Sequence, residues 1–142
     1  QELSIVESQQ MMHPIESIDA VASPEEVVEV QEAVKGVHVD DLIKQYIVSL
    51  VNSMRDHADV ALGSSPRGSL ALFRGTQALA LIRGRDFALP DDVKELSVPM
   101  LSHRIISSAA ARMRGTQQGE IVMELVDKVA VPGAQGRGWF KT

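Results

Sequence analysis

The sequence contains no cysteine, which excludes disulfide scaffolds, thiolate zinc sites and cysteine nucleophiles. Aromatic residues are also scarce, with one Trp, one Tyr and three Phe, so the core must consist mostly of aliphatic side chains. No apolar run approaches the ~18 residues of a membrane-spanning helix. Acidic residues outnumber basic ones by 19 to 14, and the resulting net charge of −5 disfavours a domain that binds nucleic acid with its whole surface.

Length and composition indicate one folded domain. A chain of 142 residues has a usual domain length, and it can bury roughly two thirds of its unfolded surface. Apolar residues make up 44% and charged residues 23%, near the globular average. The start, Gln1-Glu2, has no initiator Met and no basic leader, which is not typical of a signal peptide. We therefore expect a piece of a longer, cytoplasmic protein.

Apolar residues recur at helical spacing in most segments, which predicts an all-α fold, a small helical bundle of about four to five helices. One short extended segment is expected near 109–114. The helices are predicted over 23–36, 40–56, 65–83, 90–101 and from 116 onward, with a further short helix over 1–12. We expect 1–20 to be an N-terminal helix and linker, 21–131 the helical domain, and 132–142 a flexible Gly-rich tail.

Capping residues mark the predicted helix starts. Ser23 and Glu26 form a capping-box pattern, Ser65 is expected to cap the helix that Pro66 begins, and Thr116 is expected to cap the last helix. The inward faces are then predicted from the apolar stripes. The residues expected to face the core are Ile43, Tyr46, Ile47, Leu50, Val51, Met54, Leu70, Phe73, Leu81, Val93, Leu96, Met100, Leu101, Ile121, Val122, Leu125 and Val129.

The acidic pairs and the histidines favour structural roles. Asp40-Asp41 and Asp91-Asp92 each begin a predicted helix, where carboxylates accept hydrogen bonds from backbone donors and interact favourably with the helix dipole. A catalytic pair instead needs carboxyl groups that converge in a pocket. No histidine has another histidine at i+4, and the H-E-x-x-H motif is absent. We expect no metal site, with His57 at a solvated helix end and His103 partly buried in a helix.

The sequence lacks the short motifs of common enzymes. It contains no Walker A phosphate loop, no G-x-S-x-G and no G-x-G-x-x-G. The segment Val37–Asp41 has the apolar-then-acidic pattern of a metal-binding strand, but an amphipathic helix follows at once and a helix cap is the favoured interpretation. The chain by itself is therefore expected to be inactive as an enzyme.

One group of residues suggests an anion site. Arg67 is the second residue of a predicted helix, where free backbone N–H groups attract phosphate and a cation opposes the helix dipole. Arg74 follows seven residues later at nearly the same angle, roughly 10 Å along the axis. The small residues Ala71 and Ala78 leave this face shallow. The pattern fits either a surface that receives an anion or another protein surface, or a solvated arginine stripe.

Several motifs, in order, resemble the C-terminal lid of MoxR-type AAA+ ATPases. The match covers roughly residues 14 to 131. The matching segments are Tyr46-Ile47-Val48 with Leu50-Val51 and Arg55, Gly63-Ser64-Ser65-Pro66-Arg67-Gly68-Ser69-Leu70-Ala71-Leu72, Gln77-Ala78-Leu79-Ala80, Gly84-Arg85-Asp86, Pro90-Asp91-Asp92-Val93 and Leu101-Ser102-His103-Arg104. One departure is Leu89, which stands where the family often has a Thr or Ser cap.

The resemblance implies an all-helical lid that follows an α/β ATPase core. The arginine of the family's "SPR" motif, here Arg67, is the sensor 2 residue that reaches the terminal phosphates of ATP, so Ser65 and Pro66 are implied to lie at the nucleotide. The phosphate loop, the Walker B acids and the bound Mg²⁺ belong to the core. Arg74, Ala71 and Ala78 remain candidates for an interface.

The resemblance also implies partners: the AAA+ core, neighbouring subunits of a hexameric ring, and a von Willebrand factor A domain protein in chaperone-like maturation of client complexes. No nucleic acid and no membrane span are expected. One alternative is a free-standing helical interaction module that binds a partner helix through the Ala71–Ala78 face. Another is a DNA-binding domain that uses the helix after Pro66, which the acidic composition disfavours.

Overall fold

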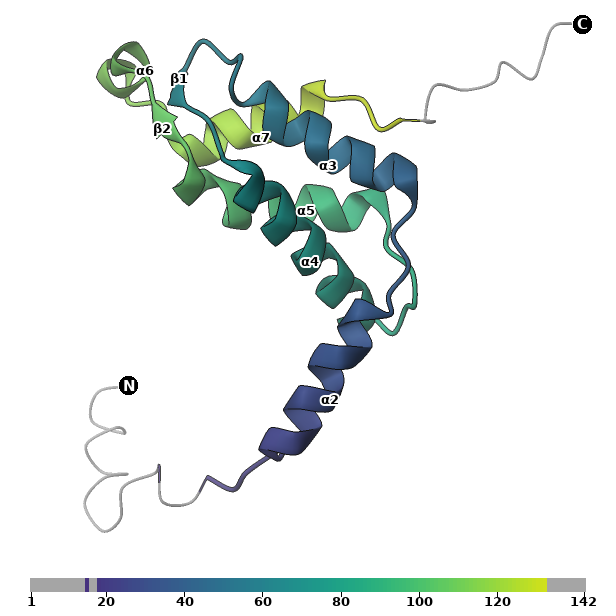
Figure 1. Cartoon of the computed structure of the whole chain (residues 1–142). Coiled ribbons are helices and arrows are strands. Elements are labelled where there is room, and N and C mark those ends of the chain that lie inside the picture. The colour runs from purple at the N-terminus through teal and green to yellow at the C-terminus, as the bar shows by residue number, and fades with distance from the viewer. Residues whose placement is uncertain (1–14, 16–17, 133–142) are drawn as a thin grey trace, which may run out of the picture. The chain divides into compact units, whose positions relative to one another are not determined.

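The computed structural model describes residue 15 and residues 18–132 (Figure 1). The helix expected over 1–12 and the tail from 133 lie outside the described residues. The chain divides into two compact units, Gln1–Glu32 and Ala33–Thr142, and each is described by itself. No helix in the described part of the chain is long and apolar enough to cross a membrane.

Helix α2 (Pro24–Lys35) begins with the predicted capping box. The Glu26 backbone N–H donates to Ser23 Oγ at 3.1 Å, and the Ser23 N–H donates to Glu26 Oε2 at 2.6 Å. None of the residues of α2 is fully buried. The sequence therefore predicts this helix and its start correctly from capping alone.

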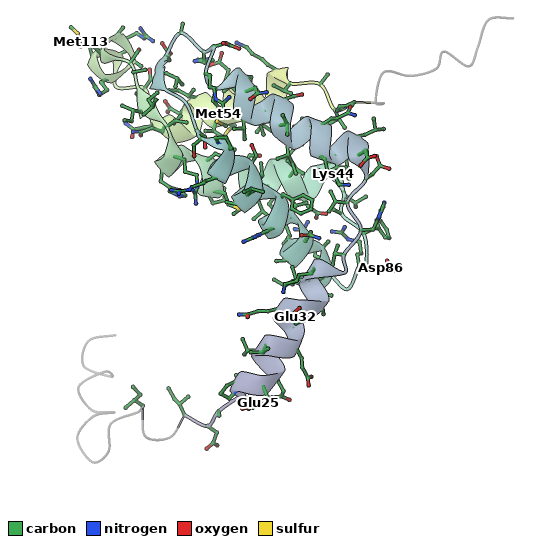
Figure 2. The ribbon with its side chains drawn as sticks, viewed as in Figure 1. Glu25, Glu32, Lys44, Met54, Asp86 and Met113 are labelled. Atoms are coloured by element: carbon green, nitrogen blue, oxygen red, sulfur yellow. The ribbon has the colours of Figure 1, made fainter. Side chains whose placement is uncertain are left out.

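The second unit is a bundle of four main helices: α3 (Asp41–Ser53), α4 (Pro66–Ile82), α5 (Pro90–Leu101) and α7 (Gln118–Lys128). Helix α5 packs against each of the other three. The core is mostly aliphatic, as predicted. Its fully buried side chains include Tyr46, Ile47, Leu50, Val51, Met54, Leu72, Val93, Leu101, Ile121 and Val122. Figure 2 shows Met54 among the bundle helices and the exposed Met113 on the short helix α6 (Ala109–Arg114).

The extended segment expected at 109–114 is wrong, because α6 occupies those residues. The extended pieces are β1 (Val60–Leu62) and β2 (Ile106–Ser107), which pair antiparallel. The Ser108 side chain accepts a hydrogen bond from the Ala111 N–H at 3.2 Å, and Gly115 ends the helix with a left-handed φ of 79°. A serine cap and three successive alanines thus favour helix over strand.

Two predicted caps differ in the structure. Ser65 is the N-cap residue of α4, but its side chain makes no capping hydrogen bond. The N-cap of α7 is Gln117 rather than Thr116. There the Gln117 N–H donates to Glu120 Oε2 at 3.0 Å. Because the Glu120 carboxylate accepts this hydrogen bond, the helix begins one residue later than a cap by the Thr116 hydroxyl predicts.

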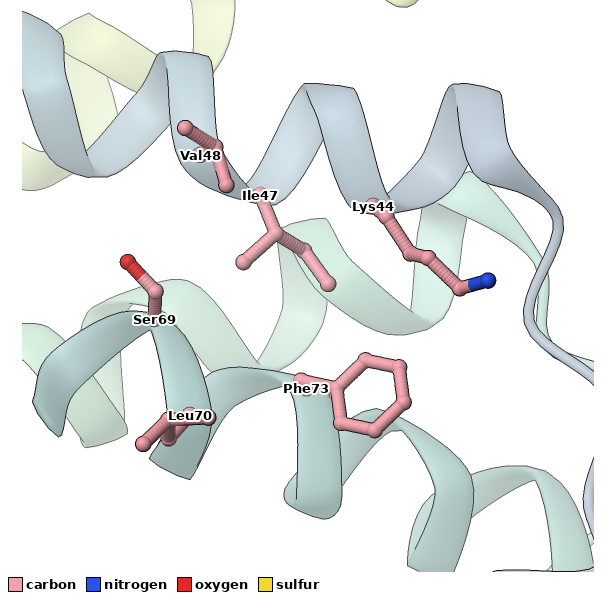
Figure 3. A pocket seen from close by; sticks show the side chains of 6 residues that line it. All are labelled: Lys44, Ile47, Val48, Ser69, Leu70 and Phe73. Carbon is pink, nitrogen blue, oxygen red and sulfur yellow. The ribbon is translucent and has the colours of Figure 1, made fainter. Parts of the chain in front are cut away.

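The core face of α4 is rotated from the predicted one. Leu70 is 57% exposed and lines a hollow between α3 and α4 (Figure 3). The fully buried residues of the helix are instead Leu72, Thr76 and Ala80. Thr76 can be buried because its hydroxyl donates to the Leu72 carbonyl at 2.8 Å. Of the residues predicted to face the core, Phe73 does pack against it and Leu81 is half-buried, so the prediction is wrong for Leu70.

Gly75 allows α4 to lie close to α5, and Gly68 allows it to lie close to the loop that precedes it. A Cβ at Gly75 would meet Met100 Sδ at 2.6 Å, and a Cβ at Gly68 would meet Ser64 Oγ at 2.0 Å and Leu101 at 3.4 Å. Ser64 itself is 1% exposed. The start of α4 is thus packed directly against the loop before it and the end of α5.

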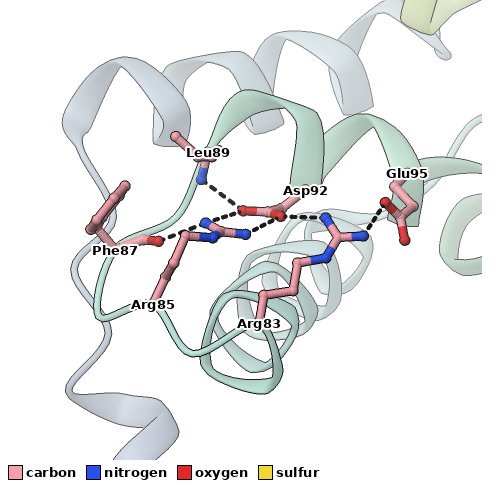
Figure 4. A network of polar contacts seen from close by, with 6 residues as sticks. All are labelled: Arg83, Arg85, Phe87, Leu89, Asp92 and Glu95. Atoms are coloured by element: carbon pink, nitrogen blue, oxygen red, sulfur yellow. Dashed lines mark hydrogen bonds and ion pairs between the residues drawn. The ribbon is translucent and has the colours of Figure 1, made fainter.

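A buried carboxylate ties the end of α4 to the start of α5 (Figure 4). Both oxygens of Asp92 accept from Arg85, at 2.6 and 2.9 Å, and Arg83 donates to Oδ1 at 3.0 Å. The Leu89 N–H donates to Oδ2 at 2.8 Å. Asp92 thereby supplies the cap that Leu89 lacks, which supports the structural interpretation of the Asp91-Asp92 pair.

These contacts set the charge state of Asp92. Burial alone would raise its pKa, but the hydrogen bonds from Arg85 and from the Leu89 N–H, together with Arg83, outweigh burial and hold the pKa below the ordinary 3.8. A carboxyl group with a lowered pKa stabilises the fold above its unfolded pKa. That contribution is lost as the pH falls below about 4 and through the folded pKa.

Asp92→Asn should lower the free energy of unfolding at pH 7 by about 2–4 kcal/mol, because an amide N–H₂ would face the arginine donors. The variant should also lose less stability than the wild type as the pH falls below about 4. Urea unfolding followed by circular dichroism at several pH values measures both effects. The matched control is Asp91→Asn. The exposed Asp91 carboxylate pairs with Lys94 at 3.3 Å, and its replacement should change stability by less than about 1 kcal/mol. If wild type and Asp92→Asn lost the same free energy of unfolding as the pH fell below about 4, the prediction would be wrong.

Gly68→Ala should destabilise the domain by about 1–2 kcal/mol through its contact with Ser64. In a Ser64→Gly background the same substitution should be neutral or stabilising, because helix propensity then dominates. The control is Gly119→Ala in α7, where the nearest atom to a new Cβ lies at 3.6 Å. Equal effects of Gly68→Ala in both backgrounds would show that this contact does not limit packing.

Candidate functional site

The start of α4 is held in place by the loop before it. The Arg55 guanidinium, just after α3, donates to the Ser64 carbonyl through Nε at 3.4 Å and Nη2 at 3.3 Å. Its Nη1 donates to Asn52 Oδ1 at 3.2 Å. A Cβ at Gly63 would lie 2.8 Å from Arg55 Cγ, so only glycine fits over this side chain. Arg55 therefore fixes the loop that leads into Pro66 and Arg67.

Arg67 lies where the sequence predicts it, as the exposed second residue of α4. Ser65 and Pro66 precede it and are exposed as well. The Gly68 N–H donates to the Ser65 carbonyl at 2.8 Å, which closes the first turn. The Arg67 side chain thus starts from a firmly held helix end and projects from an exposed position.

A shallow depression of about 320 Å³ gathers Arg67, Arg74 and Arg104, with Leu70 and Ala71 between them. The structure therefore brings together three of the predicted residues: Arg67, Ala71 and Arg74. Ala78, Ser65 and Pro66 are not part of its lining. Arg104 is a lining residue that residue patterns on one helix could not find.

Arg104 comes from another part of the chain. It ends the 3-10 turn η2 (Ser102–Arg104) that follows α5, and its Nε–H donates to the Met100 carbonyl at 2.9 Å. The close packing of α5 on α4 brings this turn beside the first turns of α4. The motif Leu101–Arg104 contained the residue, but only the helix packing reveals its neighbours.

The depression is strongly basic. Three arginines line it, and no carboxylate belongs to its lining among the described residues. Neither Arg67 nor Arg74 forms an ion pair with any residue that the structure describes, whereas Arg83, Arg85 and Arg114 each pair with an aspartate. Such an arrangement attracts anions and disfavours cations.

A second hollow, of about 270 Å³, lies between α3 and α4 (Figure 3). Ile47 and Val48 of α3 face Leu70 and Phe73 of α4 across it, and Leu70 also lines the arginine depression. The Lys44 ammonium at its edge donates to Asp41 at 2.8 Å. Apart from Lys44 and Ser69, the residues that line this hollow are apolar.

The other candidate residues have structural surroundings. Asp40 caps α3 by accepting from the Leu42 N–H at 2.8 Å. His57 is not at a solvated helix end, because α3 ends at Ser53; the His57 side chain is 14% exposed and lies 3.6 Å from Glu124. His103 is exposed rather than partly buried. Within residues 18–132, no group of three or more His, Asp or Glu side chains is placed to hold a metal ion.

Comparison with known proteins gives the chain's family. Residues 52–125 match the AAA lid domain family. The chain is 41% identical over 132 residues to protein YeaC of Bacillus subtilis. The aligned residues make up 93% of this chain and 41% of YeaC. It is 28% identical over 121 residues to the chaperone MoxR1 of Mycobacterium tuberculosis, which covers 79% of this chain and 32% of MoxR1.

Comparison of the fold with solved structures agrees with the sequence comparison. The crystal structure of a candidate ATPase from Cytophaga hutchinsonii superimposes with a TM-score of 0.82 at 26% identity, over 92% of this chain and 42% of that one. The chain thus spans less than half the length of each of these relatives. The family match exceeds half of the chain, and named MoxR proteins are among the relatives. The chain therefore belongs to the AAA lid domain family and, within it, to the MoxR type.

Proposed function

We propose that the chain is the lid of an ATP-hydrolysing MoxR-type AAA+ protein and that Arg67 is its sensor 2 arginine. The observation that carries the proposal is the position of Arg67, exposed on a fixed helix start in a depression that no carboxylate of the described residues lines. In that position the guanidinium offsets negative charge on the terminal phosphates of a nucleotide held by the ATPase core. Ser65 and Pro66 set its direction.

The ATPase core, rather than the lid, would supply the phosphate loop and the residues that hold Mg²⁺, and the ion would offset negative charge on the phosphates. Hydrolysis removes the group that Arg67 contacts, and the lid then rotates as a rigid body. The rotation is passed on to a client complex, in keeping with the relative named chaperone MoxR1. We propose a cytoplasmic hexameric ring and a von Willebrand factor A domain protein as the partner.

Arg67→Ala in the full-length protein should lower the ATP turnover number by about 10²-fold, because a preorganised charge at the transferring phosphate is lost. Arg67→Lys should restore little of this loss, since the planar guanidinium fork is absent. Steady-state phosphate release measures both variants.

Arg112→Ala is the matched control for the turnover measurement. Arg112 is an exposed arginine on α6 that does not line the depression, so its removal should leave the turnover unchanged. Wild-type turnover by Arg67→Ala would refute the sensor 2 role.

The apolar hollow between α3 and α4 favours a second candidate function, a helical interaction module without nucleotide. Leu70 and Val48 are 57% and 49% exposed at its edges, whereas the Ala71–Ala78 face first considered for a partner helix is half-buried. The coding region upstream of Gln1 distinguishes the two functions. A phosphate loop and Walker B acids there support the lid, and a start codon at or near Gln1 supports the module.

A further inference from the structure

Arg67, Arg74 and Arg104 line one depression, and their surroundings differ from those of the arginines that stabilise the bundle through ion pairs. Arg83, Arg85 and Arg114 each face an aspartate at hydrogen-bonding distance. The three arginines of the depression have no carboxylate among the described residues that line it, although acidic residues outnumber basic ones in the chain. Three like charges in one hollow repel one another, so an anion bound among them would remove an unfavourable interaction.

The Arg104 guanidinium is held in a way that leaves it available to a ligand. Its Nε–H donates to the Met100 carbonyl at 2.9 Å, which ties the side chain to the end of α5. Neither of its terminal NH₂ groups has a hydrogen-bond partner among residues 18–132. An arginine anchored in this manner presents its two NH₂ groups as donors. It loses less side-chain rotamer entropy than an unanchored arginine when it binds a phosphate oxygen.

The spacing of the three side chains suits a chain of anionic groups. Arg67 and Arg74 are two helical turns apart, roughly 10 Å along the axis of α4. Arg104 approaches from the turn after α5, and the small Ala71 lies between. The volume of about 320 Å³ is open enough for a phosphate chain to lie along the helix.

We propose that Arg74 and Arg104 are further phosphate-binding residues, which together with Arg67 hold the phosphate chain of a nucleoside triphosphate. The proposal rests on the proposed lid function and extends the lid's contribution from one arginine to three. Arg67 acts at the transferring phosphate. Arg74 and Arg104 bind the triphosphate and orient it, so they contribute mainly to nucleotide affinity.

Arg74→Gln and Arg104→Gln in the full-length protein should each raise the Kd of a non-hydrolysable ATP analogue about tenfold, because each removes charge-assisted hydrogen bonds. The Kd of AMP, which lacks the outer phosphates, should stay within about twofold of the wild type. Isothermal titration calorimetry with both ligands measures the two constants. Thermal melting of each variant checks that the fold is retained, and Arg104→Lys, which keeps the charge but loses the anchored fork, should give an intermediate Kd.

Arg112→Gln on α6 is the matched charge control and should leave both Kd values unchanged. Unchanged affinity for the triphosphate in Arg74→Gln and Arg104→Gln overturns the proposal, while the sensor 2 role is still decided by the turnover of Arg67→Ala. An equal loss in Arg112→Gln also overturns it, because the effect is then general to surface charge. A wild-type protein that binds no nucleotide refutes the lid function and this proposal together.

Discussion

The close contact between α4 and α5 determines which side chains lie together at the candidate site. Gly75 removes a side chain that would separate the two helices, and Gly68 removes one that would meet the loop before α4. Asp92 joins the end of α4 to the start of α5 through Arg83 and Arg85. An antiparallel pair held at both ends cannot slide. The turn after α5 is therefore fixed beside the first turns of α4, and the basic depression forms where the two meet.

The same residue type has two uses in this pair of helices. At one end, Arg83 and Arg85 are bound by a buried carboxylate, and the hydrogen bonds among these groups offset the cost of removing the charges from water. At the other end, Arg67, Arg74 and Arg104 line a depression that has no carboxylate among the described residues, which leaves them available to an external anion. The acidic composition does not contradict an anion site, since local charge and total charge are separate properties of the surface.

Sequence periodicity and capping predict the main helices, because local hydrogen bonds and apolar stripes determine them. The errors occur where tertiary contacts decide. Leu70 is exposed and Thr76 buried because the approach of α5, not hydrophobicity, selects the inward face of α4. The segment 109–114 is helical because Ser108 caps it, and a short alanine run gives little periodicity from which to predict a helix.

The candidate site also combines residues that the sequence can place together with one that only the tertiary structure can place. Arg67 and Arg74 can be paired from the sequence because both lie on one helix, and a helix fixes their angle and separation. Arg104 follows thirty residues after Arg74, so only the packing of α5 brings it to the depression. An anion held by Arg67 and Arg104 together would connect the start of α4 with the end of α5. Loss of a phosphate would then act on the helix pair as one body rather than on a single side chain, which is what a rigid lid requires.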